Sequence, residues 1–144
     1  MMKKLFISFI TLIALLAGCS QGVSPEEIAK VAYEWEKAKF NNDYEKQQEI
    51  IYEEDSYEVD KDSKKIDSGL KYEDIRFEIY YDKELDQYYV FADFKNPNGD
   101  NSVKDNIVLR KKADVWKVDT SKSLDINRDE VKEELEQEAC IHCE

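Results

Sequence analysis

The hydrophobic pattern of the chain changes to an alternating one at about residue 75, and this change limits the fold more than any other feature. Every second residue from 75 to 81 is apolar, which is typical of a strand with one buried face. A short acidic turn follows, and the next run, Tyr88 to Lys95, is predicted to pair with the strand at residues 75–81. If Tyr81 faces Tyr88, the opposed pairs are Ile75–Phe94, Phe77–Ala92, Ile79–Val90 and, on the other face, Arg76–Asp93.

A second hairpin is predicted from Asn106–Arg110 and Val115–Thr120, joined by Lys111–Asp114. This turn places Leu109 opposite Trp116 and Ile107 opposite Val118. The four segments together predict a four-stranded antiparallel meander with one apolar face for helices to cover.

Two helices are predicted before the sheet. Ser24 with Glu27 makes a capping box, and Pro25 suits the first helical position. Asp43 can cap a second helix after the Asn41-Asn42 break. The face of the first helix that is predicted to be buried consists of Ile28, Val31, Ala32, Trp35 and Ala38. The prediction is an α+β fold in which a helical hairpin packs on the sheet.

Residues 121–144 are predicted to be an acidic C-terminal helix with a cysteine-containing tail. Asn127 can cap this helix, and Ile126 with Val131 forms a hydrophobic staple. Its apolar side holds only Val131, Leu135 and Ala139. We therefore expect the helix to dock weakly or to project outward.

Residues 1–18 are predicted to be a secretory signal. Lys3 and Lys4 precede an apolar run, Leu5–Leu16, that is shorter than the roughly 20 residues needed to span a bilayer. Leu16-Ala17-Gly18-Cys19 resembles the lipobox of bacterial lipoproteins. The resemblance implies cleavage before Cys19 and a lipid anchor on its sulfur, with palmitate among the acyl chains. The alternative is an ordinary signal peptide that carries a cysteine by chance.

The lipobox predicts a chain anchored in the cell membrane on the extracytoplasmic side. Residues 19–23 would form the whole tether, which reaches at most about 17 Å when extended. The net charge of −12 becomes −14 once Lys3 and Lys4 are removed with the signal. This acidic balance argues against nucleic-acid binding and favours basic partners or cations. The alternative is that the charge only keeps the chain in solution.

The chain is predicted to have two helices followed by a curved sheet that ends in "VWKVD", residues 115–119. This order of elements resembles that of a group of lipoproteins. These are the cystatin-like and nuclear-transport-factor-2-like lipoproteins of Gram-positive bacteria, and the stretch "YEWEKAKFNNDYEKQQEII" is similar to their helical hairpin. The resemblance covers residues 24–120 and implies the cystatin-like fold. It implies a role in excluding redundant DNA transfer or in contacting an envelope apparatus. The acidic C-terminal helix and cysteine tail depart from the pattern.

The sequence predicts no catalytic residue and no cofactor. His142 is the single histidine, and the chain has neither a nucleophile elbow nor a glycine-rich phosphate loop. The expected function is therefore a non-catalytic module that binds a protein. The alternatives are an enzyme or a ligand-pocket protein that uses the space between helices and sheet, and a metal- or thiol-active tail.

Two groups of side chains are candidate sites. The predicted register places Tyr80, Tyr89 and Phe91 on the sheet face opposite the core, where they form an interaction surface or are covered by the C-terminal helix. In the tail, Cys140 and Cys143 with His142 have three interpretations: a local disulfide or idle thiols, metal ligands, or a redox pair. Glu144 would be a fourth metal ligand.

Overall fold

Residues 22–144 form an α+β domain in the structure, which is a computed structural model that describes these residues. The helices are α1 (Pro25–Phe40), α2 (Tyr44–Ile50), α3 (Thr120–Ser123) and α4 (Arg128–Glu134), and a 3-10 turn spans Tyr72–Asp74. The strands are β1 (Arg76–Asp82), β2 (Gln87–Lys95), β3 (Ser102–Lys112), β4 (Val115–Val118) and β5 (Gln137–Ile141). The predicted α+β class with an antiparallel sheet is confirmed, but these residues form five strands and not four.

The predicted start of the first helix is confirmed. The Ser24 amide donates to Oε2 of Glu27 over 2.8 Å, and the Glu27 amide donates to Oγ of Ser24 over 3.2 Å. This reciprocal pair satisfies amides that would otherwise lack partners at the helix end. Asp43 caps α2 by accepting from the Lys46 amide, so both helices begin where their capping residues predict.

The register of the β1–β2 hairpin is also confirmed. Tyr81 pairs with Tyr88, and Arg76 lies opposite Asp93. The apolar partners between them are fully buried, namely Phe77, Ile79, Val90 and Ala92. A shift by one residue would turn these side chains to the opposite face, so burial fixes the register.

The predicted register of the second hairpin is wrong by two residues. Leu109 pairs with Val118, and Lys111 pairs with Trp116. The cause is a turn of only two residues, Ala113 and Asp114, whose φ angles of 49° and 64° are both positive. A shift of two residues leaves each side chain on its predicted face, which is why the alternation pattern did not reveal the turn length.

The C-terminal segment differs most from the prediction. Helix α4 ends at Glu134, and the chain then extends along β1 as the antiparallel edge strand β5. Cys140 lies opposite Glu78, and Ala139 lies opposite Ile79. Without β5, the outer edge of β1 would present unpaired backbone groups, and pairing with this edge outweighs the helical preference of the local sequence.

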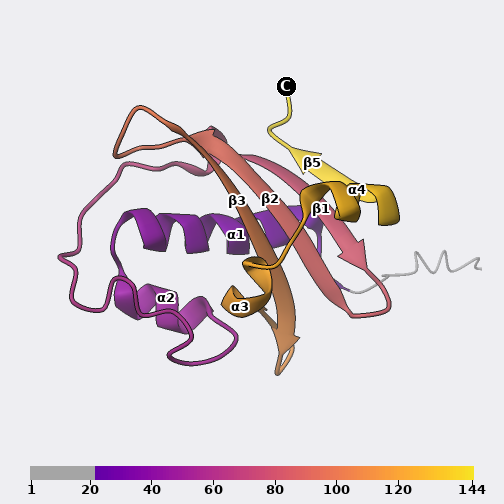
Figure 1. The fold of residues 1–144 in the computed structure, drawn as a ribbon, viewed down its shortest axis with the longest axis horizontal. Coiled ribbons are helices and arrows are strands. Elements are labelled where there is room, and N and C mark those ends of the chain that lie inside the picture. Colours follow the sequence, from indigo (N-terminus) through magenta and orange to yellow (C-terminus); the bar gives the residue numbers. More distant parts are fainter. Residues whose placement is uncertain (1–21) are drawn as a thin grey trace, which may run out of the picture.

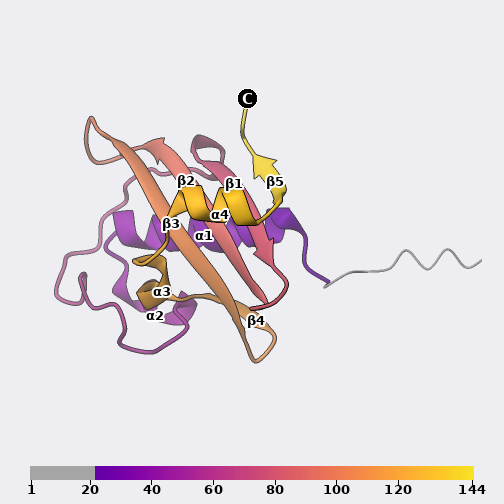
Figure 2. The ribbon, with the colours of Figure 1, turned by 45° about the vertical axis from the view of Figure 1, so that its right-hand side comes forward.

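The sheet has the order β4-β3-β2-β1-β5, with α1 on one face and α4 on the other (Figure 1). The turned view in Figure 2 shows the same three layers. The main core lies between α1 and the sheet and includes Ile28, Ala32, Trp35, Phe77, Ile79, Val90, Ile107 and Leu109. A second apolar cluster beneath α4 contains Tyr80, Tyr89, Phe91, Val108 and Val131. The C-terminal helix therefore docks on the sheet and does not project outward.

Candidate ligand-binding cleft

A cleft of about 430 Å³ opens beside the C-terminal half of α1, within the 300–1,000 Å³ range of small-molecule sites. Trp35 and Val118 are buried side chains of its lining, and Tyr57 packs edge-on against Trp35 with ring centroids 5.1 Å apart. The complete lining is Trp35, Lys39, Ser56, Tyr57, Val59, Asp105, Asn106, Val118, Thr120, Ser121, Ser123 and Leu124. The cleft is thus built by α1, β3, β4, α3 and the segment after α2.

Three ionisable side chains meet at the inner end of the cleft. Lys39 Nζ lies 3.2 Å from Oε2 of Glu36, one helical turn earlier, and it also contacts the Asp105 carboxylate of β3. Glu36 is fully buried, and neither of its carboxyl oxygens has a hydrogen-bond partner among the described residues. The ammonium group of Lys39 lies 5.5 Å from the ring centroid of Trp35, which adds a cation–π contact.

The surroundings shift the pKa values of these three groups in different ways. Burial raises the pKa of Glu36 well above its usual range; Lys39 opposes this shift and Asp105 adds to it. Burial also raises the pKa of Asp105, but the nearby Glu36 carboxyl group and the charge of Lys39 lower it by more, so the net pKa of Asp105 lies below its usual value. Burial lowers the pKa of Lys39, and the two carboxyl groups raise it more. These shifts favour a protonated Glu36 beside an ionised Lys39–Asp105 pair.

The rim of the cleft combines hydroxyl groups with exposed apolar side chains. Ser56 Oγ and Thr120 Oγ1 lie 2.8 Å apart and join the segment after α2 to α3. Val59 is 73% exposed and Leu124 is 87% exposed, although both are apolar. The rim therefore exposes apolar side chains to water, next to a cluster of ionisable groups that are paired with one another.

The aromatic group predicted on the second sheet face lies beneath α4. Tyr80, Tyr89 and Phe91 are all buried, and Val131 packs against them. The prediction of an exposed interaction surface is therefore wrong, and cover by the C-terminal helix, the alternative derived from the sequence, is the arrangement that forms. The apolar faces of α4 and of the sheet explain this contact, because each removes the other from water.

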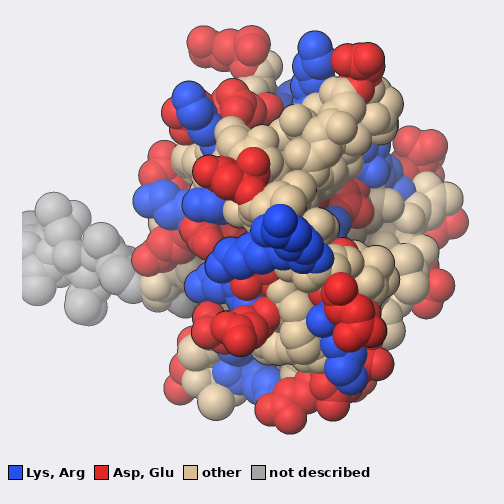
Figure 3. Space-filling model, turned by 90° about the vertical axis from the view of Figure 1, so that its left-hand side faces the viewer, with Lys and Arg blue, Asp and Glu red and all other residues tan. Residues whose placement is uncertain are grey.

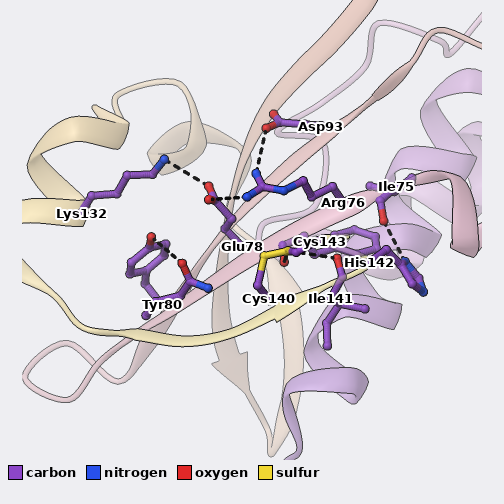
Figure 4. The surroundings of a disulfide bond; sticks show 12 residues. Ile75, Arg76, Glu78, Tyr80, Asp93, Lys132, Cys140, Ile141, His142 and Cys143 are labelled. Atoms are coloured by element: carbon purple, nitrogen blue, oxygen red, sulfur yellow. Dashed lines mark hydrogen bonds and ion pairs between the residues drawn. A yellow bond between two sulfur atoms is a disulfide. The ribbon is translucent and has the colours of Figure 1, made fainter.

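Asp93 has two basic partners on this same face. Its Oδ2 lies 3.8 Å from Nη1 of Arg76, the predicted partner, and its Oδ1 accepts from Nη1 of Arg128 over 2.8 Å. Figure 4 shows Arg76 reaching both Asp93 and Glu78, with Lys132 approaching Glu78 from α4. The Arg128–Asp93 and Lys132–Glu78 pairs join α4 to the sheet.

The cysteines of the tail are joined in a Cys140–Cys143 disulfide at the end of β5 (Figure 4). Between them, Nδ1 of His142 lies 2.8 Å from the Ile75 carbonyl oxygen, and the ring packs edge-on against Tyr72. Both sulfur atoms are therefore occupied in covalent bonding and not free to bind a metal. Within residues 22–144, no group of three or more His, Cys, Asp or Glu side chains is arranged to hold a metal ion.

Cys19, the predicted lipid attachment site, lies outside the described residues. From Gly22 onward, the structure contains no helix that is both long and apolar enough to cross a bilayer.

Sequence reasoning missed the ionic cluster of the cleft. Lys39 and Asp105 are 66 residues apart, so their proximity depends on how α1 lies across the sheet. One local signal was present: Glu36 falls four residues after Ala32 and seven after Ala29, on the buried stripe of the helix. A charged residue on such a stripe indicates a buried partner.

Comparison with protein-family models, with curated proteins and with solved structures gives no match for this chain.

Proposed function

We propose that the chain is a non-catalytic binding module that a lipid on Cys19 anchors to the outer side of the cell membrane. The observation that carries the proposal is Leu16-Ala17-Gly18-Cys19 directly behind a basic start and a short apolar run. Helix α1 begins at Pro25, so about five residues separate the lipid from the folded domain. The domain would lie close to the membrane surface.

The domain is proposed to have a cystatin-like arrangement. In favour of this assignment, the α1–α2 hairpin precedes an antiparallel meander of β1 to β4, and α1 packs on one face of that meander. Helix α4 and strand β5 are then additions to the common pattern. They cover the second face and the outer edge of β1.

The proposed partner is a protein, and the acidic charge of the chain favours a basic one. The aromatic group beneath α4 does not provide the contact surface, so the partner would bind elsewhere. On the face drawn in Figure 3, Lys and Arg side chains lie among Asp and Glu side chains, and the visible described residues form no continuous basic surface. This mixture supports a protein contact over a nucleic-acid contact.

Binding of a small ligand is a second candidate function, and the cleft is the observation that favours it. Lys39 lies 14 residues along α1 from Pro25, which corresponds to about 21 Å at 1.5 Å per residue. The cleft is therefore separated from the proposed tether by most of the helix length. A ligand outside the membrane would have access to it.

The anchor is tested by fractionating cells that express the wild-type chain, Cys19→Ser or Cys140→Ser in the presence of labelled palmitate. We expect the wild type to be membrane-bound and labelled, and Cys19→Ser to lose both properties. Cys140→Ser is the matched control, because it removes a cysteine elsewhere and should keep both. Membrane binding and labelling that persist in Cys19→Ser would overturn the proposal.

A further inference from the structure

We propose that the cleft binds an uncharged small molecule that carries an aromatic or branched aliphatic group. The proposal deepens the second candidate function, ligand binding in the cleft, and does not depend on the lipid anchor. It follows from the balance of charge in the cleft, from the apolar side chains at its rim and from the hydrogen bonds that its hydroxyl groups already make.

The charged groups of the cleft are already paired with one another. Lys39 contacts both Glu36 and Asp105, and no other ionisable side chain of the lining carries a charge at neutral pH. Behind the cleft, Asp119 accepts from Arg110 over 3.0 Å. A charged ligand would lose its hydration without gaining an unpaired counter-charge, and this loss is costly in a partly buried site.

The rim of the cleft carries apolar side chains that the fold leaves exposed to water. Leu124 and Val59 are the two most exposed large apolar side chains of the described residues, and both belong to this lining. Trp35 and Val118 are buried apolar side chains of the same lining. An aromatic or branched aliphatic group seated here would remove the exposed side chains from water, which is favourable in proportion to the area covered.

The polar groups at the rim suit neutral hydrogen bonding. Ser123 donates to the Asp119 carbonyl over 2.7 Å, and Ser121 donates to the Asp119 carboxylate over 2.8 Å. Their protons are thus engaged. Ser123 Oγ already accepts from the Val108 amide over 3.0 Å and keeps one lone pair, and Ser121 Oγ keeps lone pairs that can accept from a ligand. Burial raises the pKa of the Tyr57 phenol, so this group stays neutral and can donate. These groups would orient the ligand without requiring it to carry a charge.

Two fluorescent probes that differ by one charge test the proposal. N-phenyl-1-naphthylamine is uncharged, and 1-anilinonaphthalene-8-sulfonate is the same ring system with a sulfonate. Titration uses the chain from residue 19 with Cys19→Ser, which stays in aqueous buffer. We expect the uncharged probe to bind at least tenfold more tightly. Equal affinity, tighter binding of the anionic probe, or no binding of the uncharged probe would overturn the proposal.

Substitutions at exposed positions locate the bound probe. Leu124→Asp and Val59→Asp should each weaken binding of the uncharged probe at least tenfold. Leu85→Asp and Val115→Asp are matched controls, because these side chains are 57% and 52% exposed and lie outside the cleft. All four positions are on the surface, so the variants should fold. Equal losses in the controls would contradict binding in the cleft.

The outcome is independent of the membrane anchor. If Cys19→Ser stays membrane-bound in cells but the probe results hold, the anchoring proposal fails and the ligand proposal stands. If the anchor is verified and the uncharged probe shows no preference, the ligand proposal alone fails.

Discussion

Arg128 of α4 donates from Nη1 to Oδ1 of Asp93 in β2 over 2.8 Å. The same guanidinium donates to Oδ1 of Asn106 over 2.6 Å and to the Asp105 carbonyl over 2.9 Å, both on β3. Its carbon Cζ lies 4.9 Å from the ring centroid of Phe91. One side chain therefore ties α4 to two strands and covers part of the aromatic cluster beneath it.

Replacing this guanidinium should loosen α4. Arg128→Met keeps an unbranched side chain but removes all three hydrogen bonds, so we expect the free energy of unfolding to fall by about 1–3 kcal/mol. Relative to the wild type, amide exchange should accelerate more in α4 than in α1. Urea denaturation and hydrogen exchange measure the two effects.

Lys132→Met is the matched control on the same helix. Lys132 pairs with Glu78 over 3.2 Å, but its side chain is 41% exposed, compared with 19% for Arg128. An exposed pair of this kind contributes about 0–1 kcal/mol. Equal destabilisation by the two substitutions would contradict the role of Arg128.

The first hairpin and the helix starts could be predicted because their determinants are local. Tyr81 and Tyr88 are close in sequence, and the alternation on either side of their turn fixes one register. Ser24 and Glu27 are likewise separated by one helical turn. In both cases the residues that determine the structure lie within a few positions of one another in the sequence.

The errors in the C-terminal half arise where the determining partner is distant. Glu138 and Ala139 lie in a stretch whose composition favours a helix. This stretch instead pairs with the open edge of β1 and forms β5. The Ala113-Asp114 turn has positive φ angles at both positions, which Asp tolerates but Ala disfavours, so the length of the turn was not evident from the sequence. The cleft cluster similarly depends on α1 bringing Lys39 to Asp105.

Removing the carboxyl group of Glu36 should change how stability depends on pH. The folded-state pKa of Glu36 is raised, mainly by burial, so its contribution to stability is complete at acid pH and is lost as pH rises toward that pKa. Glu36→Gln has the same shape and no titration. We expect the variant to resemble the wild type near pH 4 and to exceed it at pH 7 by on the order of 1 kcal/mol.

Denaturation across pH 4–8 measures this difference, and Glu54→Gln, at an exposed position, is the control. The control should parallel the wild type throughout. A Glu36→Gln variant whose stability advantage shrinks with rising pH would contradict a buried neutral carboxyl group at this site.

The Cys140–Cys143 disulfide should stabilise β5 locally and contribute little to the stability of the whole domain. It closes a loop of only four residues, for which the chain-entropy relation gives a contribution of roughly 2 kcal/mol at most. In the double variant Cys140→Ser/Cys143→Ser we expect the domain to remain folded, with faster amide exchange in β5. Global unfolding of this variant would show instead that the disulfide is needed for the fold.

The intact mass of the chain extracted from the membranes of expressing cells tests the central claim most directly. We predict a polypeptide that begins at Cys19 and carries the added mass of a diacylglycerol, with this species absent from the Cys19→Ser variant. A polypeptide that begins at another residue, or that begins at Cys19 without added lipid, would contradict membrane anchoring of this domain.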